Sequence, residues 1–296
     1  MSFEQQGIIH QELVLGNTLP NAEPQQSSHA LFISLSELIA ESVFYHPALA
    51  AGGVELLPEL EQNSLKSLLN GLSIEEHFVS VLVERITQSI IAEHASIRIC
   101  LSSSDSYAFK ALIGGSIEED EVNPAMGVRG VSRFASSKYS PAFALECKVI
   151  KALQEKGHNV EIVVPFVRAL SDAATIIDRL AEQGLPRGLN GLKVLYVCSV
   201  PSAALVAEKL LQYFDGVVID WDDLTQMTLA VDKHNDAISY LYNPESEAVS
   251  QLANLVVTAA NLAKKPVVVV TRGLENYPKL QEHLVENIQP ESIFNF

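Results

Sequence analysis

The chain has 296 residues, of which 48% are hydrophobic, and its formal net charge is -16. This length is enough to bury one large core or two modest ones. The strong acidic balance, with a pI near 4.9, argues against a nucleic-acid backbone or an anionic membrane surface as a partner.

The three cysteines, Cys100, Cys147 and Cys198, are widely spaced, and each lies in apolar sequence. This favours buried, reduced thiols in a cytosolic protein over a disulfide framework. The first basic residue is Lys66, so the N-terminus lacks the basic start of a signal peptide. No apolar run approaches the roughly 20 residues that a membrane helix needs. We therefore expect a soluble, cytoplasmic protein with no membrane partner.

Residues 1–30 are rich in Gln, Asn, Ser and Pro, which predicts an N-terminal arm that is poorly ordered or peripheral to the core. From residue 31 onward, strand-like and helix-like runs alternate. The predicted strands are Leu31–Leu35, Ile97–Leu101, Gly127–Gly130, Val160–Pro165, Lys193–Cys198, Gly216–Ile219, Val267–Thr271 and Ser292–Phe296. The predicted helices between them are Leu72–Glu93, Ala142–Glu155, Ser171–Gln183, Ser202–Phe214, Glu245–Ala263 and Leu274–Asn287.

This alternation predicts that residues 31–296 form an α/β fold, a (β/α)8 TIM barrel, with a doubly wound open sheet as the alternative. The run Val267–Val270 is apolar on both faces, as parallel strands covered by helices are. The sequence ends on the eighth predicted strand. We therefore expect the last helix of the barrel to be missing, or replaced by the N-terminal arm or by another subunit.

Two predicted strands run into polar or acidic residues that could take part in catalysis or binding. Lys193–Cys198 runs into Ser199, and Gly216–Ile219 runs into the acidic segment Asp220–Asp223. Barrel enzymes keep their catalytic groups where strands open into helices. The first of these ends has a serine where a metal site would need a carboxylate.

Several ordered motifs resemble phosphoenolpyruvate (PEP) synthase. They are Asn123–Gly130, Phe143–Cys147, Val160–Arg168, Asn190–Lys193, Cys198–Ser202, Tyr213–Gly216 and Asp223–Gln226, with His46-Pro47 after the first strand. The resemblance covers roughly residues 31–296 and implies the C-terminal PEP/pyruvate-binding barrel of that family. The family's nucleotide-binding and phosphohistidine domains have no counterpart in these motifs.

The resemblance implies substrate-binding roles for three arginines. Arg98 and Arg129 match the residues that hold the substrate phosphate and carboxylate, and Arg168 matches an arginine that follows the Pro-Phe-Val strand. It also implies that Asp223 is one of two magnesium ligands. The second ligand position is Ser199, a loss that Asp222 or Asp220 could offset. The family's catalytic cysteine falls on Val270, which cannot transfer a proton.

The residues themselves leave these roles open. Arg98 alternates with Ile97 and Ile99, so it faces away from them and into the barrel. A buried guanidinium there needs an anion, which is either a ligand or a structural partner such as Asp223 or a neighbouring acid. Arg129 has the same two interpretations. Three further arginines at strand ends either extend one positive mouth or neutralise nearby acids; they are Arg133, Arg168 and Arg272.

Two hypotheses follow. In the first, this is a catalytically degenerate barrel that binds a small 2-oxo acid or a PEP-like anion and acts as a binding, regulatory or assembly subunit. It would form a homodimer or pair with a related subunit. In the second, it is an enzyme, either half of a split phosphotransferase or a lyase of a 2-oxo acid. Mg²⁺ is the one cofactor expected, at a weakened site.

Overall fold

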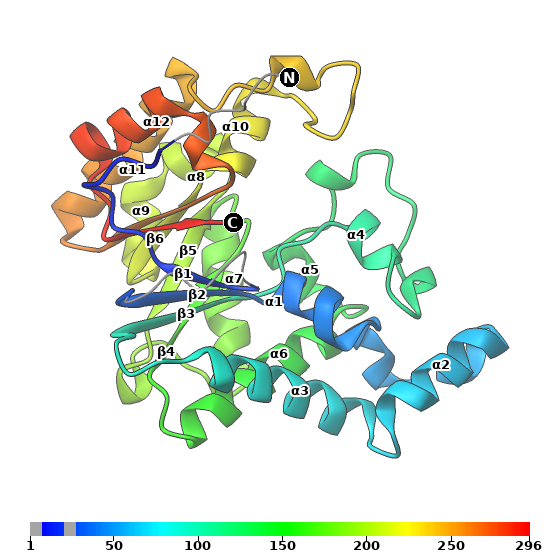
Figure 1. Cartoon of the computed structure of the whole chain (residues 1–296). Coiled ribbons are helices and arrows are strands. Elements are labelled where there is room, and N and C mark those ends of the chain that lie inside the picture. The colour runs from blue at the N-terminus through cyan, green and yellow to red at the C-terminus, as the bar shows by residue number, and fades with distance from the viewer. Residues whose placement is uncertain (1–7, 21–27) are drawn as a thin grey trace.

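Eight parallel strands form one curved sheet in the computed structural model, which describes residues 8–20 and 28–296 (Figure 1). Each strand pairs with the next one along the chain. The strands are β1 (Asn17–Leu19), β2 (Ala30–Ser34), β3 (Ser96–Cys100), β4 (Val160–Val164), β5 (Val194–Cys198), β6 (Gly216–Asp220), β7 (Val267–Thr271) and β8 (Ser292–Asn295).

The sheet closes on itself through the segment that precedes β1. The Gly16 amide donates to the Ile293 carbonyl, and the Ile293 amide donates to the Val14 carbonyl, both at 2.8 Å. The fold is therefore a nearly closed (β/α)8 barrel, as predicted, and the open-sheet alternative is wrong. Only Phe296 follows β8.

One predicted strand is wrong, and a segment of the predicted arm takes its place. Gly127–Gly130 is a turn before α5, because Gly130 has a φ of 55° and a Cβ there would lie 2.4 Å from the Pro165 carbonyl oxygen. Asn17–Leu19 forms β1 instead, with Leu19 in the core. The peripheral-arm expectation thus fails for these residues, while 1–7 and 21–27 lie outside the described ones.

Helices cover the outside of the barrel and build a large projection beside it (Figure 1). They are α1 (Leu35–Leu38), α2 (Glu59–Leu69), α3 (Ile74–Ser89), α4 (Ser106–Lys110), α5 (Val131–Ala135), α6 (Ser140–Glu155), α7 (Leu170–Glu182), α8 (Pro201–Leu205), α9 (Ala207–Tyr213), α10 (Trp221–Leu229), α11 (Glu247–Ala263) and α12 (Pro278–His283). None of the described helices is long and apolar enough to cross a membrane.

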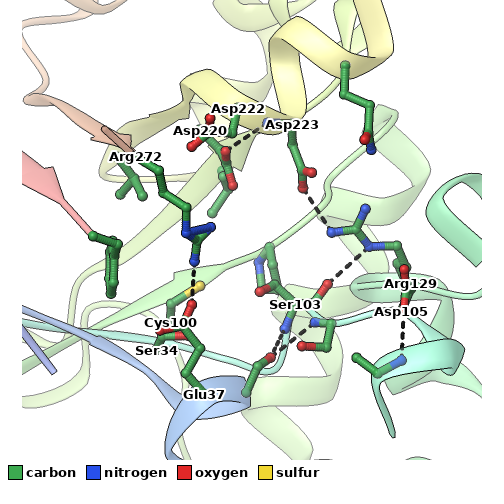
Figure 2. A pocket seen from close by; sticks show the side chains of 18 of the residues that line it. Ser34, Glu37, Cys100, Ser103, Asp105, Arg129, Asp220, Asp222, Asp223 and Arg272 are labelled. Atoms are coloured by element: carbon green, nitrogen blue, oxygen red, sulfur yellow. Dashed lines mark hydrogen bonds and ion pairs between the residues drawn. The ribbon is translucent and has the colours of Figure 1, made fainter. Parts of the chain in front are cut away.

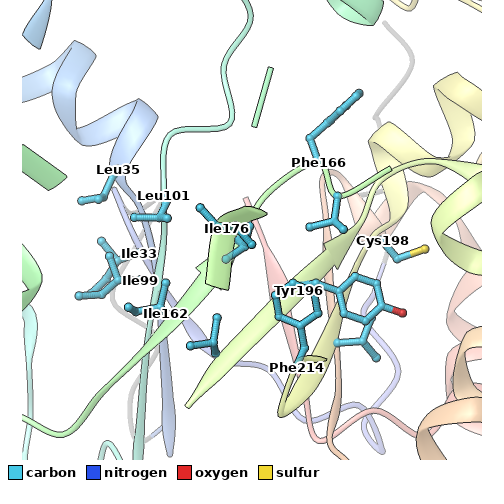
Figure 3. Close-up of a cluster of buried hydrophobic side chains, with 14 of the residues drawn as sticks. Ile33, Leu35, Ile99, Leu101, Ile162, Phe166, Ile176, Tyr196, Cys198 and Phe214 are labelled. Atoms are coloured by element: carbon cyan, nitrogen blue, oxygen red, sulfur yellow. The ribbon is translucent and has the colours of Figure 1, made fainter. Parts of the chain in front are cut away.

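Side chains alternate between two hydrophobic clusters, one on each side of the sheet. Ile33, Ile99 and Ile162 point outward and pack under the helices, as Figure 3 shows. The inward-facing residues form a smaller apolar cluster inside the barrel, which consists of Ala30, Phe32, Cys100, Val163, Leu195, Val197, Val218, Val268, Val270 and Phe294. Burial on both faces explains the continuous apolar strands.

A buried polar network joins His46 and Glu118, in the segments that follow β2 and β3, to Arg133 on α5 and Tyr139 at the start of α6. Glu118 accepts hydrogen bonds from the Tyr139 hydroxyl at 2.8 Å and from Arg133 Nη1 at 3.1 Å, and it lies 2.7 Å from His46 Nε2. Burial by itself would raise the pKa of Glu118, but the bonds from His46, Arg133 and Tyr139 lower it to about 2. Arg133 is therefore a structural residue of this network.

The role of β1 in closing the barrel predicts that Gly16→Ala destabilises the protein. A Cβ at residue 16 would lie 2.0 Å from the ring of Phe294, which is fully buried against Phe32. We expect a loss of about 1–3 kcal/mol in the free energy of unfolding, measured by urea denaturation. Adding Phe294→Leu should restore part of it. An unchanged unfolding midpoint for Gly16→Ala would contradict the close packing of this segment.

Candidate functional site

A pocket of about 250 Å³ opens where the strands end, at the C-terminal side of the barrel (Figure 2). Its floor is apolar and includes Phe32, Cys100, Val197, Val218 and Val270. Its walls are polar and come from the segments that follow β2, β3, β6 and β7. Barrel enzymes place their chemistry at this end of the strands, so this is the candidate site.

Arg129 is the central cation of the pocket wall. Its Nε donates to the Ser103 carbonyl at 3.0 Å, its Nη1 to the Ala125 carbonyl at 3.2 Å and its Nη2 to Asp223 Oδ2 at 2.8 Å. The guanidinium carbon lies 4.2 Å from the centre of the Phe166 ring. Arg129 is 7% exposed, so these contacts fix its position. A ligand anion must therefore share or replace Asp223 at this guanidinium.

Three aspartates lie at the start of α10, and each is already engaged. Asp220 Oδ1 accepts from the Asp223 amide at 3.0 Å and caps the helix. Asp222 accepts from the Tyr242 hydroxyl at 2.7 Å. Burial raises the pKa of Asp220 to about 7, and the neighbouring charges of Asp223 and Asp222 add to the effect. Positive side chains therefore neutralise only part of the negative charge of these three aspartates.

The two residues at the expected magnesium-ligand positions are engaged by another group or lie outside the pocket lining. Asp223 pairs with Arg129, and Ser199, at 1% exposed, is not among the described residues that line the pocket. Within residues 8–20 and 28–296, no group of three or more His, Cys, Asp or Glu side chains is arranged to hold a metal ion. Magnesium needs an octahedral set of oxygens, to which proteins contribute one or two free carboxylates.

No side chain at the end of β7 can act as an acid or a base. Val270 lies there in the pocket floor, 9% exposed. Cys100 is the one cysteine that lines the pocket among the described residues, and burial raises the pKa of its thiol well above the usual value. Cys198 faces the helices instead. Nothing on the apolar floor therefore holds a readily exchanged proton at neutral pH.

Backbone amides after β3 are held by two side chains that sequence reasoning missed. Ser36 Oγ accepts from the amides of Ser103 and Ser104, at 2.7 and 3.0 Å. Glu146 on α6, 1% exposed, accepts from the Ser102 amide at 2.9 Å. The same segment presents the Ser103 carbonyl to Arg129. The acidic residue buried among apolar ones in Phe143–Cys147 was the only signal for this contact.

Acids outnumber bases around the pocket. Arg272 at the end of β7 forms an ion pair with Glu37 on α1 (Figure 2). The described ionisable residues that line the pocket are Glu37, Asp105, Asp220, Asp222, Asp223, Arg129, Lys233, Arg272 and His234. Five carboxyl groups thus face three fixed cations, so the pocket is acidic in balance, which favours the alternative in which strand-end arginines neutralise nearby acids.

The other predicted arginines lie outside the pocket lining. Arg168 donates to the carbonyls of Gly127 and Arg129, at 2.9 and 3.2 Å, so it holds the turn that carries Arg129. Arg98 faces into the barrel but lies at the opposite end, where Glu161 and Glu291 bind it. The structure therefore brings together Arg129, Asp222, Asp223 and Val270 of the predicted site, and not Arg98 or Arg168.

The comparisons with known proteins agree on one family. A family model described as PEP-utilising enzyme, PEP-binding domain matches residues 72–285. Phosphoenolpyruvate synthase of Escherichia coli (strain K12) is 34% identical over 260 residues, which are 85% of this chain and 32% of that protein. The synthase of Pseudomonas aeruginosa (strain UCBPP-PA14) is 34% identical over 273 residues, 88% and 34% respectively. The chain thus spans about a third of the length of these relatives.

The buried Glu146 predicts a specific dependence of stability on pH. Burial raises its pKa to about 7, and the bond from Ser102 only partly opposes this. Since the folded state disfavours the carboxylate, stability should fall as pH rises from about 4.5 through about 7, by roughly 3 kcal/mol at most. Glu146→Gln, which keeps an oxygen for the Ser102 amide, should lose the part of the fall that Glu146 contributes, so its stability should decrease less steeply with pH than that of the wild type.

The measurement is the unfolding free energy of both proteins between about pH 5 and pH 8. Glu155→Gln, at an exposed position on the same helix, is the matched control and should keep the wild-type slope. Parallel curves for the wild type and Glu146→Gln would show that Glu146 does not titrate in this range.

Proposed function

Since this chain belongs to the PEP-utilising enzymes and contains their PEP-binding domain, we propose that its pocket binds a small 2-oxo acid or PEP-like anion without converting it. The main support for this proposal is the pocket itself. Arg129 lies in its wall, whereas Val270 in its floor is not a proton donor. In this proposal the barrel serves as a binding, regulatory or assembly subunit.

The charge balance of the pocket supports a singly charged 2-oxo acid over a phosphorylated one. Arg129 and Arg272 are each paired with a pocket acid, Asp223 and Glu37. A ligand with several negative charges would meet the unpaired excess of carboxylates, whose repulsion is strong in a partly buried site. A single carboxylate can instead exchange for Asp223 on Arg129, because both present the same two oxygens.

The proposal includes no bound magnesium and no phosphotransfer. The carboxylates of α10 are engaged by Arg129, by Tyr242 and by the helix amide, which supports binding that is independent of a divalent cation. As a subunit, the barrel would act as a homodimer or beside a related chain. Leu255 and Leu262 on α11 are half exposed or more and offer apolar surface for such pairing.

We predict that the protein binds pyruvate in isothermal titration calorimetry, that the dianion oxalate binds more weakly, and that adding magnesium leaves both affinities unchanged. Arg129→Ala should weaken binding by about tenfold or more, because a charge-assisted bond to the carboxylate is lost. Arg179→Ala is the matched control, since Arg179 forms only an exposed pair with Glu182. Tight oxalate binding that requires magnesium would overturn the proposal.

We further predict no exchange of the pyruvate methyl protons into deuterated water, followed by NMR with stoichiometric protein. Val270 offers no acid or base where the family's catalytic cysteine falls, and the neighbouring Asp220 carboxyl is held as the cap of α10, so the enolisation that the enzyme hypothesis requires has no free agent there. Exchange that is present in the wild type and lost in Arg129→Ala would instead favour the enzyme hypothesis, with the split phosphotransferase or the lyase as its two forms.

A further inference from the structure

A second pocket, of about 390 Å³, lies at the opposite end of the barrel, where the strands begin. Its lining comes from the first residues of β2, β3 and β8 and from the segments before β5 and β7. The charged residues that line it are Arg98, Lys193, Glu161 and Glu291. Two cations and two carboxylates balance, so this pocket lacks the acidic excess of the first one.

Arg98 is the buried charge of this pocket, at 2% exposed. Its Nε donates to Glu161 Oε2 at 2.9 Å, and its Nη2 donates to Glu291 Oε1 at 2.6 Å. Its Nη1 is buried and has no hydrogen-bond partner in the part of the chain that the structure describes. A buried donor of a charged group without an acceptor is costly, so this nitrogen marks a place for an oxygen.

The two acids that bind Arg98 differ in how firmly they are held. Glu161 is 9% exposed on its side chain and also accepts from Lys193 Nζ at 3.0 Å, so both of its oxygens are occupied. The Glu291 side chain is 47% exposed and contacts Arg98 through Nη2 alone. Glu291 can therefore turn into solvent while Glu161 stays in place.

We propose that this pocket is a second binding site, for a small organic carboxylate. The ligand carboxylate would occupy the Nη1–Nη2 edge of Arg98 with two parallel hydrogen bonds, the geometry that guanidinium groups favour. Glu291, which now holds one of these nitrogens, moves aside into solvent. Arg98 and Lys193 both bind Glu161, each at one of its two carboxylate oxygens. In the proposal, Lys193 pairs with a second acidic group on the ligand.

The test uses malonate, a dicarboxylate without a 2-oxo group, in calorimetry with the full chain carrying Arg129→Ala. This background removes the guanidinium of the first pocket, so the result is independent of the function proposed there. We expect saturable binding. Adding Glu291→Gln removes the internal competitor and should tighten binding by about three- to tenfold. Adding Arg98→Lys keeps a cation beside Glu161 but loses the fork, and should weaken binding by about tenfold.

Glu286→Gln, at an exposed position before β8, makes the same charge change away from the pocket and should leave the affinity unchanged. If Arg98→Lys does not fold, the comparison of Glu291→Gln with Glu286→Gln decides alone. No saturable malonate binding in the Arg129→Ala background, or equal affinities for these two glutamine variants, would overturn the second site.

Discussion

The ion pair between Arg129 and Asp223 is the interaction on which the first pocket depends. It joins the turn before α5 to the start of α10, so two connections far apart in sequence form one wall. Two carbonyl acceptors and the Phe166 ring hold the same guanidinium, which is why it stays buried in spite of its charge. An anion entering the pocket must therefore exchange with Asp223. In the proposed function, this exchange favours ligands that carry a carboxylate.

The acidic residues around the Arg129–Asp223 pair limit how much further negative charge the pocket can hold. Asp220 is partly buried, and its loss of solvent, followed by the charges of Asp223 and Asp222, raises its pKa to about 7, so the pocket disfavours a third full negative charge. The resemblance implied that Asp223 is a magnesium ligand and that Asp222 could offset the loss at Ser199. Here one caps a helix, one accepts from a tyrosine and one pairs with an arginine. Of these partners only Arg129 carries a charge, so the cluster keeps an excess of negative charge although each carboxylate has a hydrogen-bond partner.

The sequence predicted the strands whose apolar pattern reflects their burial in the core. Runs such as Val267–Thr271 are apolar on both faces because the sheet is covered on both sides, and they were identified correctly. Asn17–Leu19 has only three residues in a polar context, so its pairing with β2 left no pattern. Arg129 was found through a motif. Glu146 lies in the matched segment Phe143–Cys147, but its role was not predicted, and neither was that of Ser36, because both act through backbone amides, which no residue pattern records.

Arg98 shows why a motif can identify a residue and misplace its role. Residues two apart on a strand face the same side but differ in depth by about 6–7 Å. On β3 this separates Arg98, which reaches the pocket where the strands begin, from Cys100, which lines the pocket where they end. The apolar residues inside the barrel, with Phe32 and Val218 among them, fill the space between the two. Because this layer excludes water and charge, the two ends can carry separate ion pairs and bind different anions.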